Sequence, residues 1–258
     1  MSSMKGKVAL ITGGTGGIGR AAAVEFARRG ASVVVTGRRQ EEGERTVGLV
    51  KEQGARGLFI RADVSKEADV AETIKRTLNE FGALHYAFNN AGIEGTLGPV
   101  VEQTEAEYRR IFDINVLGVL LSMRHEIPAI ISSGGGAIVN NASILGSVGM
   151  PGVSVYSASK HAVIGLTKCA ALEVAKSGVR VNTLSPGPTA TDMADRFVGQ
   201  MAPGSEAEAA RKAFEAMIPM GRIARSEELA GAAVWLCSDE ASFMTGQDLL
   251  IDGGIGAA

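Results

Sequence analysis

Short apolar runs alternate with longer segments of helical pattern along the whole chain. The runs are rich in valine, isoleucine and leucine, and glycine or polar residues bound them. Continuous apolar strands separated by helices are typical of a parallel sheet that is covered on both faces. We therefore predict an α/β fold, a single doubly wound domain whose seven-stranded parallel sheet is flanked by helices. The predicted strands are Val8–Thr12, Ser32–Thr36, Gly57–Ala62, Leu84–Asn89, Ala137–Asn141, Val179–Leu184 and Asp248–Ile251.

The segments between these runs have the periodicity of helices. In one of them, apolar side chains recur at Val70, Ile74, Leu78 and Phe81, and Gly82 follows. This stripe predicts an amphipathic helix that ends at a glycine cap. No linker, repeat or low-complexity stretch interrupts the alternation, so we expect the whole chain, 1–258, to form one domain.

The longest irregular stretch of the chain runs from about residue 192 to residue 219. It contains Gly199, the pair Pro203-Gly204 and a helical piece rich in alanine and charged residues. Long loops in compact domains often close over a ligand. We expect this segment to be a substrate lid, although a surface excursion without a function would show the same pattern.

Composition narrows the possible functions. A net charge of −2 and a charged fraction of 21% predict no nucleic-acid partner and no membrane partner, and no stretch approaches the length of a membrane helix. Cys169 and Cys237 lie in apolar helical contexts, which predicts reduced thiols in the core. His85, His125 and His161 lack the spacing of metal ligands, so we expect no metal site. The first apolar run is too short for a signal peptide, which favours a cytoplasmic protein.

A glycine-rich turn follows the first predicted strand and precedes a helical segment. Gly14, Gly16 and Gly19 satisfy the pattern G-x-G-x-x-G, and Gly13 and Gly17 with Gly19 satisfy the overlapping pattern T-G-x-x-x-G-x-G. Such glycines allow a tight turn and let the backbone approach a pyrophosphate at the helix N-terminus. The strand before and the helix after the turn favour a dinucleotide site of the Rossmann type over a glycine-rich surface turn.

The residues after the second predicted strand bear on which dinucleotide is bound. A site for NAD would place an acidic residue there, to bind the ribose 2′-hydroxyl. This chain has Gly37-Arg38-Arg39, and two guanidinium groups could clamp a 2′-phosphate. NADP(H) is therefore the favoured cofactor and NAD(H) the less favoured one, although Glu41 and Glu42 lie close enough in sequence to weaken the clamp.

Candidate acid–base chemistry lies in the second half of the chain. Tyr156 and Lys160 are four residues apart and would share one face of a helix, and Ser143 precedes them. An ammonium beside a phenol favours the phenolate and lowers the pKa of the tyrosine from its usual value near 10. The pair therefore predicts a general acid or base that is coupled to redox chemistry, whereas alone it would more often be a packed tyrosine beside an exposed lysine.

Taken together, these motifs resemble the single-domain short-chain dehydrogenases/reductases from nearly one end of the chain to the other. Asn115, Ser143, Tyr156 and Lys160 occupy the places of the catalytic tetrad of that family. The resemblance implies that Ser143 orients a carbonyl, that Tyr156 transfers the proton, that Lys160 tunes Tyr156 and holds the ribose, and that Asn115 holds a water that relays protons to Lys160. Together with the turn and the arginines, it implies cofactor contacts from Gly13, Thr15, Gly17, Ile18, Gly19, Arg38, Arg39, Asp63, Val64, Asn90, Ala91, Gly92, Tyr156, Lys160, Pro186, Gly187, Thr189 and Thr191.

The substrate is expected to be an uncharged ketone or secondary alcohol, because the side chains expected to form its pocket are mostly apolar. Arg196 in the expected lid is the one arginine that could meet a substrate carboxylate. The expected pocket residues are Ile144, Leu145, Met150, Val153, Met193 and Phe197, with Val148 and Met201 beside them.

The expected function is that of an NADP(H)-dependent carbonyl reductase or alcohol dehydrogenase. The nearest alternative is a 3-oxoacyl-[acyl-carrier-protein] reductase, but residues 129–133 and 170–172 lack the positive charges that such an enzyme would present to its acidic carrier. An NAD-dependent alcohol or sugar dehydrogenase is a further alternative. A catalytically silent nucleotide-sensing scaffold is less favoured because the tetrad is intact. The family resemblance also implies a homotetramer.

Overall fold

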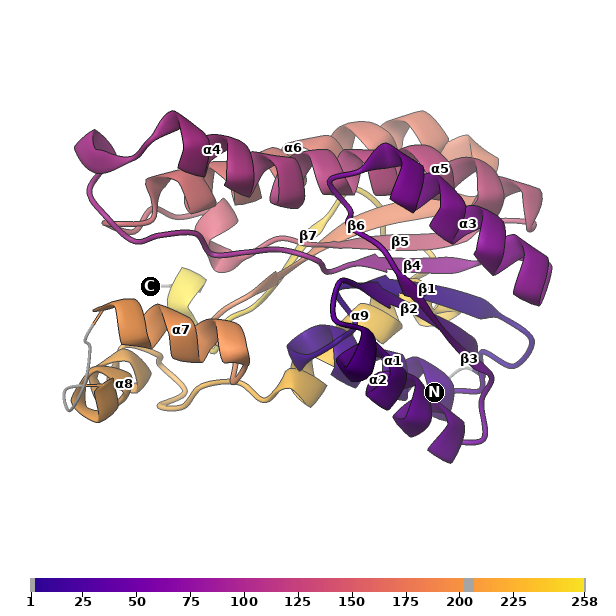
Figure 1. Ribbon diagram of the computed structural model, residues 1–258, viewed down its shortest axis with the longest axis horizontal. Helices are drawn as coiled ribbons and strands as arrows, with labels where there is room; N and C mark the ends of the chain where they lie inside the picture. The colour runs from indigo at the N-terminus through magenta and orange to yellow at the C-terminus, as the bar shows by residue number, and fades with distance from the viewer. Residues whose placement is uncertain (1–2, 202–206, 258) are drawn as a thin grey trace.

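A seven-stranded parallel sheet forms the centre of the protein, in the order β3-β2-β1-β4-β5-β6-β7 (Figure 1). The computed structural model describes residues 3–201 and 207–257. Each predicted strand is present, with ends that differ by no more than two residues from the prediction, so the predicted fold class is confirmed. The strands are β1 Val8–Thr12, β2 Ser32–Gly37, β3 Gly57–Arg61, β4 Tyr86–Asn89, β5 Gly136–Asn141, β6 Val179–Pro186 and β7 Asp248–Ile251.

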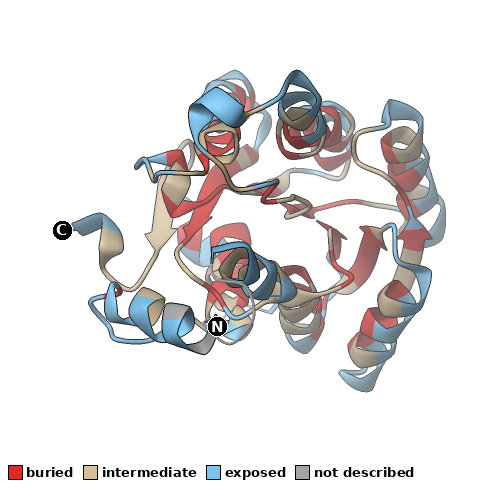
Figure 2. Cartoon of the chain, turned by 60° about the vertical axis from the view of Figure 1, so that its left-hand side comes forward, coloured by how far each residue is buried: buried red, intermediate tan, exposed pale blue. Residues whose placement is uncertain are grey.

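Helices cover both faces of the sheet and enclose two separate hydrophobic cores (Figures 1 and 2). This is the reason that the strands are apolar on both sides, and every residue of β1 is buried. One face carries α1 Gly17–Arg28, α2 Gln40–Glu52 and α9 Ser226–Cys237. The other face carries α3 Glu67–Phe81, α4 Glu105–Phe112, α5 Gly118–Ser132 and α6 Ser154–Val174.

The sheet changes direction of winding between β1 and β4. β1 pairs with β2 on one side and with β4 on the other, and Thr12 lies opposite Asn89 in the β1–β4 register. Ligands of doubly wound sheets bind at the carboxyl ends of the strands beside such a switch point. The loops that follow β1 and β4 are therefore the place to look for a site.

The predicted amphipathic helix is α3. Val70 and Ile74 are buried on its inner face, and Leu78 and Phe81 pack against the same core. Gly82 ends the helix with φ 78°, in the left-handed region that favours glycine. The periodic pattern and its glycine stop thus predicted both the buried face and the end of this helix correctly.

Two helices account for most of the stretch expected to be irregular. α7 covers Asp192–Met201 and α8 covers Ala207–Ala216, and together they project beside the carboxyl end of the sheet (Figure 1). The expectation of an irregular loop was therefore wrong, since only the helical piece in it was foreseen. No residue of α7 is buried, so packing against the sheet does not specify this helix. The pair Pro203-Gly204 lies outside the described residues.

The longest helical stretch, Glu105–Ser132, joins α4 and α5 through a π-helical turn at Asp113–Leu117. This stretch is long and apolar enough to cross a membrane by length and composition alone, contrary to the expectation from the sequence. Half of its most apolar window is buried inside the protein, as in a helix that packs on a core. Its hydropathy is thus explained by packing against the sheet.

The cysteines and histidines behave in part as expected. Cys237 is a buried thiol whose pKa burial raises to about 12, but Cys169 is exposed, so the expectation of a core position was wrong for Cys169. His85 is buried and accepts a hydrogen bond from the backbone N–H of Val8 at 3.1 Å. Among the described residues, no group of three or more histidine, cysteine or acidic side chains could hold a metal ion.

Candidate active site

The turn after β1 has no room for side chains at its glycines. Gly13 has φ 64°, and a Cβ on it would lie 2.8 Å from the Cα of Ala91. A Cβ on Gly19 would lie 2.5 Å from the carbonyl oxygen of Gly13, and one on Gly17, at φ 49°, would lie 3.0 Å from Thr191. Glycine is therefore required here by both conformation and close approach.

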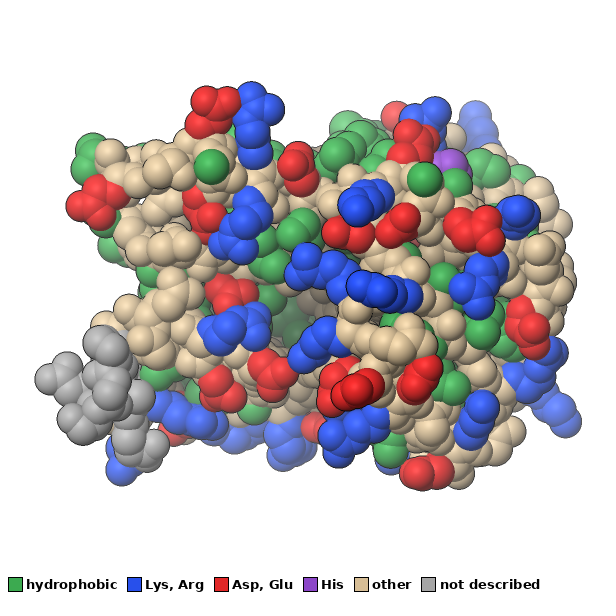
Figure 3. Space-filling model, viewed as in Figure 1, with side chains coloured by type: hydrophobic (Ala, Val, Ile, Leu, Met, Phe, Trp, Pro, Cys, Tyr) green, Lys and Arg blue, Asp and Glu red, His purple; other side chains and the backbone are tan. Residues whose placement is uncertain are grey.

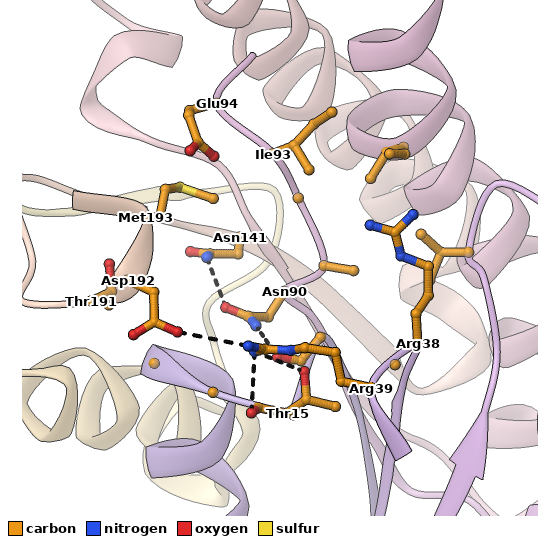
Figure 4. A pocket seen from close by; sticks show the side chains of 18 of the residues that line it. Thr15, Arg38, Arg39, Asn90, Ile93, Glu94, Asn141, Thr191, Asp192 and Met193 are labelled. Atoms are coloured by element: carbon orange, nitrogen blue, oxygen red, sulfur yellow. Dashed lines mark hydrogen bonds and ion pairs between the residues drawn. The ribbon is translucent and has the colours of Figure 1, made fainter. Parts of the chain in front are cut away.

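Polar side chains fix this turn to the loop after β4. The Thr12 hydroxyl accepts the backbone N–H groups of Asn90 and Ala91 at 3.0 and 3.1 Å. The Asn90 amide donates to the carbonyls of Thr12 and Gly13, both at 3.2 Å, and accepts from the Asn141 amide at 3.0 Å. The ends of β1, β4 and β5 are thus held together as one rigid edge, and Figure 4 shows Asn90 and Asn141 side by side.

A cleft of about 680 Å³ opens along this edge (Figures 3 and 4). Most of the residues predicted to bind the cofactor line it: Gly13, Thr15, Gly17, Ile18, Arg38, Arg39, Asp63, Val64, Asn90, Ala91, Gly92 and Thr191. The others lie outside its lining: Gly19, Tyr156, Lys160, Pro186, Gly187 and Thr189.

The cleft fits a dinucleotide. Helix α1 begins at Gly17 without a side-chain cap, so its first backbone N–H groups are free to bind a pyrophosphate. The glycines beside them leave a hollow that any Cβ would fill. Asp63, which follows β3, has a pKa below its ordinary value: burial acts against this shift, but hydrogen bonds from Ser65 and the charge of Arg38 outweigh it. An ionised carboxylate at this place can accept hydrogen bonds from an adenine or a ribose.

Two arginines at the end of β2 face the cleft from different directions (Figure 4). Arg39 lies across the turn, donates to Thr15 at 3.3 Å and pairs with Asp192 at 3.7 Å. Arg38 is exposed and faces the Asp63 side of the cleft. Glu42, expected to weaken a clamp here, is instead paired with Arg20. Two guanidinium groups are thus present where the sequence predicts them.

Three of the predicted catalytic residues meet beyond the end of β5. Tyr156 and Lys160 lie on the same face of α6, with the ammonium nitrogen of Lys160 5.6 Å from the centre of the tyrosine ring. Ser143 is the cap of a short 3₁₀ turn after β5, and it forms a hydrogen bond with Tyr156. Lys160 is buried and donates to the carbonyl of Asn141 at 2.8 Å. The predicted i, i+4 arrangement of Tyr156 and Lys160 is thus present.

The pKa values of this group run against the expectation from the sequence. Burial raises the pKa of Tyr156 to about 12; the hydrogen bond from Ser143 acts against this rise, and the charge of Glu94 adds to it. Burial lowers the pKa of Lys160 to about 8. The sequence predicted that the neighbouring ammonium lowers the pKa of Tyr156. This prediction is wrong, because loss of solvation on burial dominates the pKa shifts of both Tyr156 and Lys160.

Asn115 stands in the π-helical turn between α4 and α5, and it is buried. Its amide nitrogen donates to the carbonyl of Ile93 at 2.9 Å and to the hydroxyl of Ser159 at 3.1 Å, while its oxygen accepts from the N–H of Ile93 at 2.9 Å. A Cβ built on Gly92 would lie 3.3 Å from the Asn115 oxygen and 3.6 Å from the Lys160 nitrogen. Asn115 thus ties the loop after β4 to α6 beside Lys160, and the predicted water relay stays a prediction.

The residues expected to form the substrate pocket are not all in one place. Met193 lines the cleft, and Ile144 and Val153 are buried. Phe197 is half-buried and contacts Phe214 of α8, with ring centres 6.2 Å apart. Leu145 and Met150 are half-buried, and like Phe197 they lie outside the cleft lining. Their contact with substrate stays a prediction.

Sequence reasoning missed Glu94 altogether and left Arg196 without a partner. Glu94, in the segment after β4, is buried and bound by both Nε and Nη2 of Arg196 on α7, at 2.6 and 3.1 Å. Both residues line the cleft. The two are far apart in the sequence, so spacing carried no signal of the pair; the only available hint was an acidic residue two positions after the Asn-Ala-Gly segment.

Comparison with known proteins places the chain in a family. Residues 13–256 match the family model described as enoyl-(acyl carrier protein) reductase. The chain is 40% identical to cyclohexanol dehydrogenase of Acinetobacter sp. (strain SE19), over 96% of this chain and 94% of that protein. It is 42% identical to 2,5-dichloro-2,5-cyclohexadiene-1,4-diol dehydrogenase of Sphingobium indicum (strain DSM 16412 / CCM 7286 / MTCC 6364 / B90A), over all of both chains.

Solved structures give the same assignment. The structure of levodione reductase superposes with a TM-score of 0.96 at 36% identity, covering 98% of this chain and 99% of that one. The structure of 3-ketoacyl-(acyl-carrier-protein) reductase from Brucella melitensis complexed with NADH gives a TM-score of 0.90 at 36% identity, covering 98% and 100%.

The fold and the site thus define a nicotinamide-dependent oxidoreductase with one doubly wound domain. The chain belongs to the short-chain dehydrogenase/reductase family, as its motifs suggested.

Proposed function

We propose that this protein interconverts an uncharged ketone and a secondary alcohol with NADP(H). The observation that carries the proposal is the group of Ser143, Tyr156 and Lys160 beyond the end of β5, beside a cleft that fits a dinucleotide. The relatives that act on cyclohexanol and on a cyclohexadiene diol support an alcohol or ketone on a small ring as the class of substrate.

In the reductive direction, Ser143 donates a hydrogen bond to the substrate carbonyl and Tyr156 donates its phenolic proton to the developing alkoxide. The bound nicotinamide supplies the hydride, or accepts it when an alcohol is oxidised. Burial raises the pKa of Tyr156 to about 12, so the phenol is protonated at neutral pH and is ready to act as the acid. Lys160, when charged, favours the phenolate that remains and holds the ribose hydroxyls.

The charges in the cleft support an uncharged substrate. Arg196 was the one arginine expected to be able to meet a carboxylate, and Glu94 already binds it through two hydrogen bonds. Met193 adds apolar surface beside the pair. A neutral ketone would leave this ion pair intact.

The test of the mechanism is Tyr156→Phe, which keeps the ring and removes the proposed proton donor. We expect turnover of cyclohexanone to fall by roughly 10²–10⁴-fold, as is typical for the loss of a general acid, while cofactor affinity measured by fluorescence titration changes little. Tyr108→Phe, which removes the hydroxyl of an exposed tyrosine on α4, serves as the control and should keep full activity. Near wild-type turnover by Tyr156→Phe would refute the proposed mechanism.

Arg38 and Arg39 support NADP(H) over NAD(H), since charge-assisted bonds to a 2′-phosphate contribute about 1.5–3 kcal/mol each. Placing an acid at position 37 is not a clean test, because a Cβ on Gly37 would lie 2.7 Å from a methyl of Thr15. Arg38→Asp avoids this clash and should lower kcat/KM for NADPH at least tenfold with little loss for NADH. Arg45→Asp makes the same charge change at an exposed position outside the cleft lining and is the control. A wild-type preference for NADH would contradict the proposal.

A second candidate is reduction of a 3-oxoacyl chain on an acyl carrier protein, which the Brucella melitensis structure favours. Residues 129–133, at the end of α5, and residues 170–172, in α6, carry no positive charge to hold an acidic carrier. Turnover with acetoacetyl-carrier protein well above that with free ketones would favour this candidate.

We also propose a cytoplasmic homotetramer. An apolar groove along α4 and α5 supports the assembly, because Tyr108, Leu117 and Leu120 are exposed there beside Phe112. The segment 192–219 remains our proposed lid, since α7 borders the cleft through Asp192, Met193, Arg196 and Gln200.

A further inference from the structure

One part of the cleft is lined by an ion pair between two distant segments. Glu94 belongs to the segment after β4 and is only 8% exposed, while Arg196 belongs to α7. The guanidinium donates to both carboxylate oxygens, at 2.6 and 3.1 Å, in the two-pronged geometry that binds most tightly. Hydrogen bonding to Glu94 raises the pKa of Arg196. Figure 4 shows Glu94 directed into the cleft, toward Met193.

A second contact holds the two segments at this distance. Gln200, one turn further along α7, accepts the backbone N–H of Leu97 at 3.0 Å and donates to the carbonyl of Gly95 at 3.2 Å. These bonds contain no charged group, so they position α7 without selecting the charge of a ligand. The position of α7 and the charge at the end of the cleft are therefore set by different residues.

The other charges near the pair already have partners. Arg110 lines the cleft, and Glu107 binds it through bonds of 2.8 and 2.7 Å. Asp192, whose charge also acts on Arg196, pairs with Arg39 at 3.7 Å. Glu94 additionally lies close enough to raise the pKa of Tyr156, so its charge reaches the reaction centre.

We propose that Glu94 is the residue that restricts this enzyme to uncharged substrates. It neutralises Arg196, a cation that lines the cleft, and its own charge repels an anion near Tyr156. A substrate carboxylate would have to displace Glu94 from Arg196 and leave a buried carboxylate without its cation, which is costly. The inference rests on the proposed function and deepens it by naming what sets the substrate class.

The experiment compares cyclohexanone with 4-oxocyclohexanecarboxylate, a ketone on the same ring that adds one negative charge. Glu94→Gln keeps the shape of the side chain and frees the charge of Arg196. We expect the ratio of kcat/KM for the keto acid to kcat/KM for cyclohexanone to rise by roughly tenfold to a hundredfold, the range of one charge-assisted hydrogen bond. Arg196→Gln leaves Glu94 without a cation and should lower the same ratio below that of the wild type.

Two control variants separate charge from other effects. Gln200→Ala loosens the contact between α7 and residues 95–97 without changing charge, so it should lower kcat/KM for both ketones alike and leave the ratio unchanged. Glu80→Gln removes the carboxylate of another arginine pair, Arg56–Glu80, which is exposed and outside the cleft lining, and it should change neither value.

A binding measurement makes the result independent of turnover. Calorimetric titration with cyclohexanecarboxylate should show affinity at least tenfold higher for Glu94→Gln than for the wild type. An unchanged ratio and an unchanged affinity in Glu94→Gln would overturn the inference, while turnover of cyclohexanone by the wild type would still support the proposed function. A wild type that turns over neither ketone would refute the function for this ring system, and the binding data alone would then decide the role of Glu94.

Discussion

The glycine turn after β1 and helix α7 border the same cleft but are specified in opposite ways. In the turn, a Cβ on Gly13 or Gly19 would approach backbone atoms to within 3 Å. In α7 no residue is buried, and a Cβ on Gly199 would meet no atom within 4 Å. The glycine turn is thus defined by close packing of the backbone, and the position of α7 by a few polar side chains.

This difference predicts where the protein tolerates change. The turn leaves no free volume, so substitutions there strain the backbone of two strands at once. The position of α7 depends on the bonds made by Arg196 and Gln200, so substitutions elsewhere on its surface should have small effects on stability. Substrate range can therefore vary at α7 while the cofactor site is kept.

The largest expected effect is that of Gly19→Ala. The added methyl group would lie 2.5 Å from the Gly13 carbonyl oxygen and 2.6 Å from the Asn90 amide nitrogen, so the turn must shift. We expect the free energy of unfolding to fall by about 3 kcal/mol, at the upper end of the penalties for overpacking, and cofactor affinity to fall strongly. Urea denaturation and fluorescence titration measure these two effects. Wild-type values in both would show that the turn is more adaptable than its contacts indicate.

The next largest effect is expected from a carboxyl group that is buried beside the sheet. Glu126 on α5 is fully buried, and the Asn89 amide donates to one of its oxygens at 2.9 Å, while its other oxygen has no hydrogen-bond partner in the protein. Burial raises its pKa to about 7, and the bond from Asn89 acts in the other direction. No cation is among the groups that shift the pKa of Glu126.

A pKa that is raised on folding makes stability depend on pH. The native state holds the proton more tightly than the unfolded chain, so stability is complete below the unfolded pKa of about 4.5 and is lost as the pH rises to about 7. Glu126→Gln carries no charge and removes this loss, so it should be more stable than the wild type by about 3 kcal/mol at pH 8 and similar at pH 4. Thermal unfolding of both proteins from pH 4 to pH 8 measures it. Parallel stability curves would mean that Glu126 does not titrate in this range.

The smallest effect on stability is expected from a substitution in α7. Gly199→Ala adds a methyl group that faces open space within a helix, where alanine is favoured over glycine by about 0.5–1 kcal/mol. We expect slower hydrogen exchange in α7 and unchanged cofactor affinity, measured by mass spectrometry and by titration. A loss of stability comparable to that of Gly19→Ala would erase the contrast between the two regions.

The same contrast explains how far the sequence predicted the structure. Strands and the glycine turn follow from local patterns, since burial on both faces and tight backbone contacts restrict the residue types at each position. α7 was missed because none of its residues is buried and its apolar Phe197 contacts Phe214 of α8 rather than the sheet, whereas the alanine- and charge-rich piece was foreseen as helical. The burial of Glu126 was also invisible, because an acidic residue at that place in a helix is usually exposed.

Within the site, the residue types were predictable but their energetics were not. Tyr156 and Lys160 share a helix face as their spacing requires. The direction of the pKa shift of Tyr156 was wrong because it depends on how much water surrounds the phenol, a property of the whole fold. The Glu94–Arg196 pair likewise arises from the approach of two segments that only the tertiary structure brings together.

The π-helical turn at Asp113–Leu117 sets how α4 is rotated about the helix axis relative to α5. A helix turns by about 100° and advances about 1.5 Å for each residue. Removing one residue from the turn would therefore rotate α4 by about that angle relative to α5. Tyr108 and Phe112 would then leave the line of Leu117 and Leu120, while Asn115 would lose its reach to Ser159. One widened turn thus sets both the outer apolar surface and the buried contact between Asn115 and Ser159, so neither can change without the other.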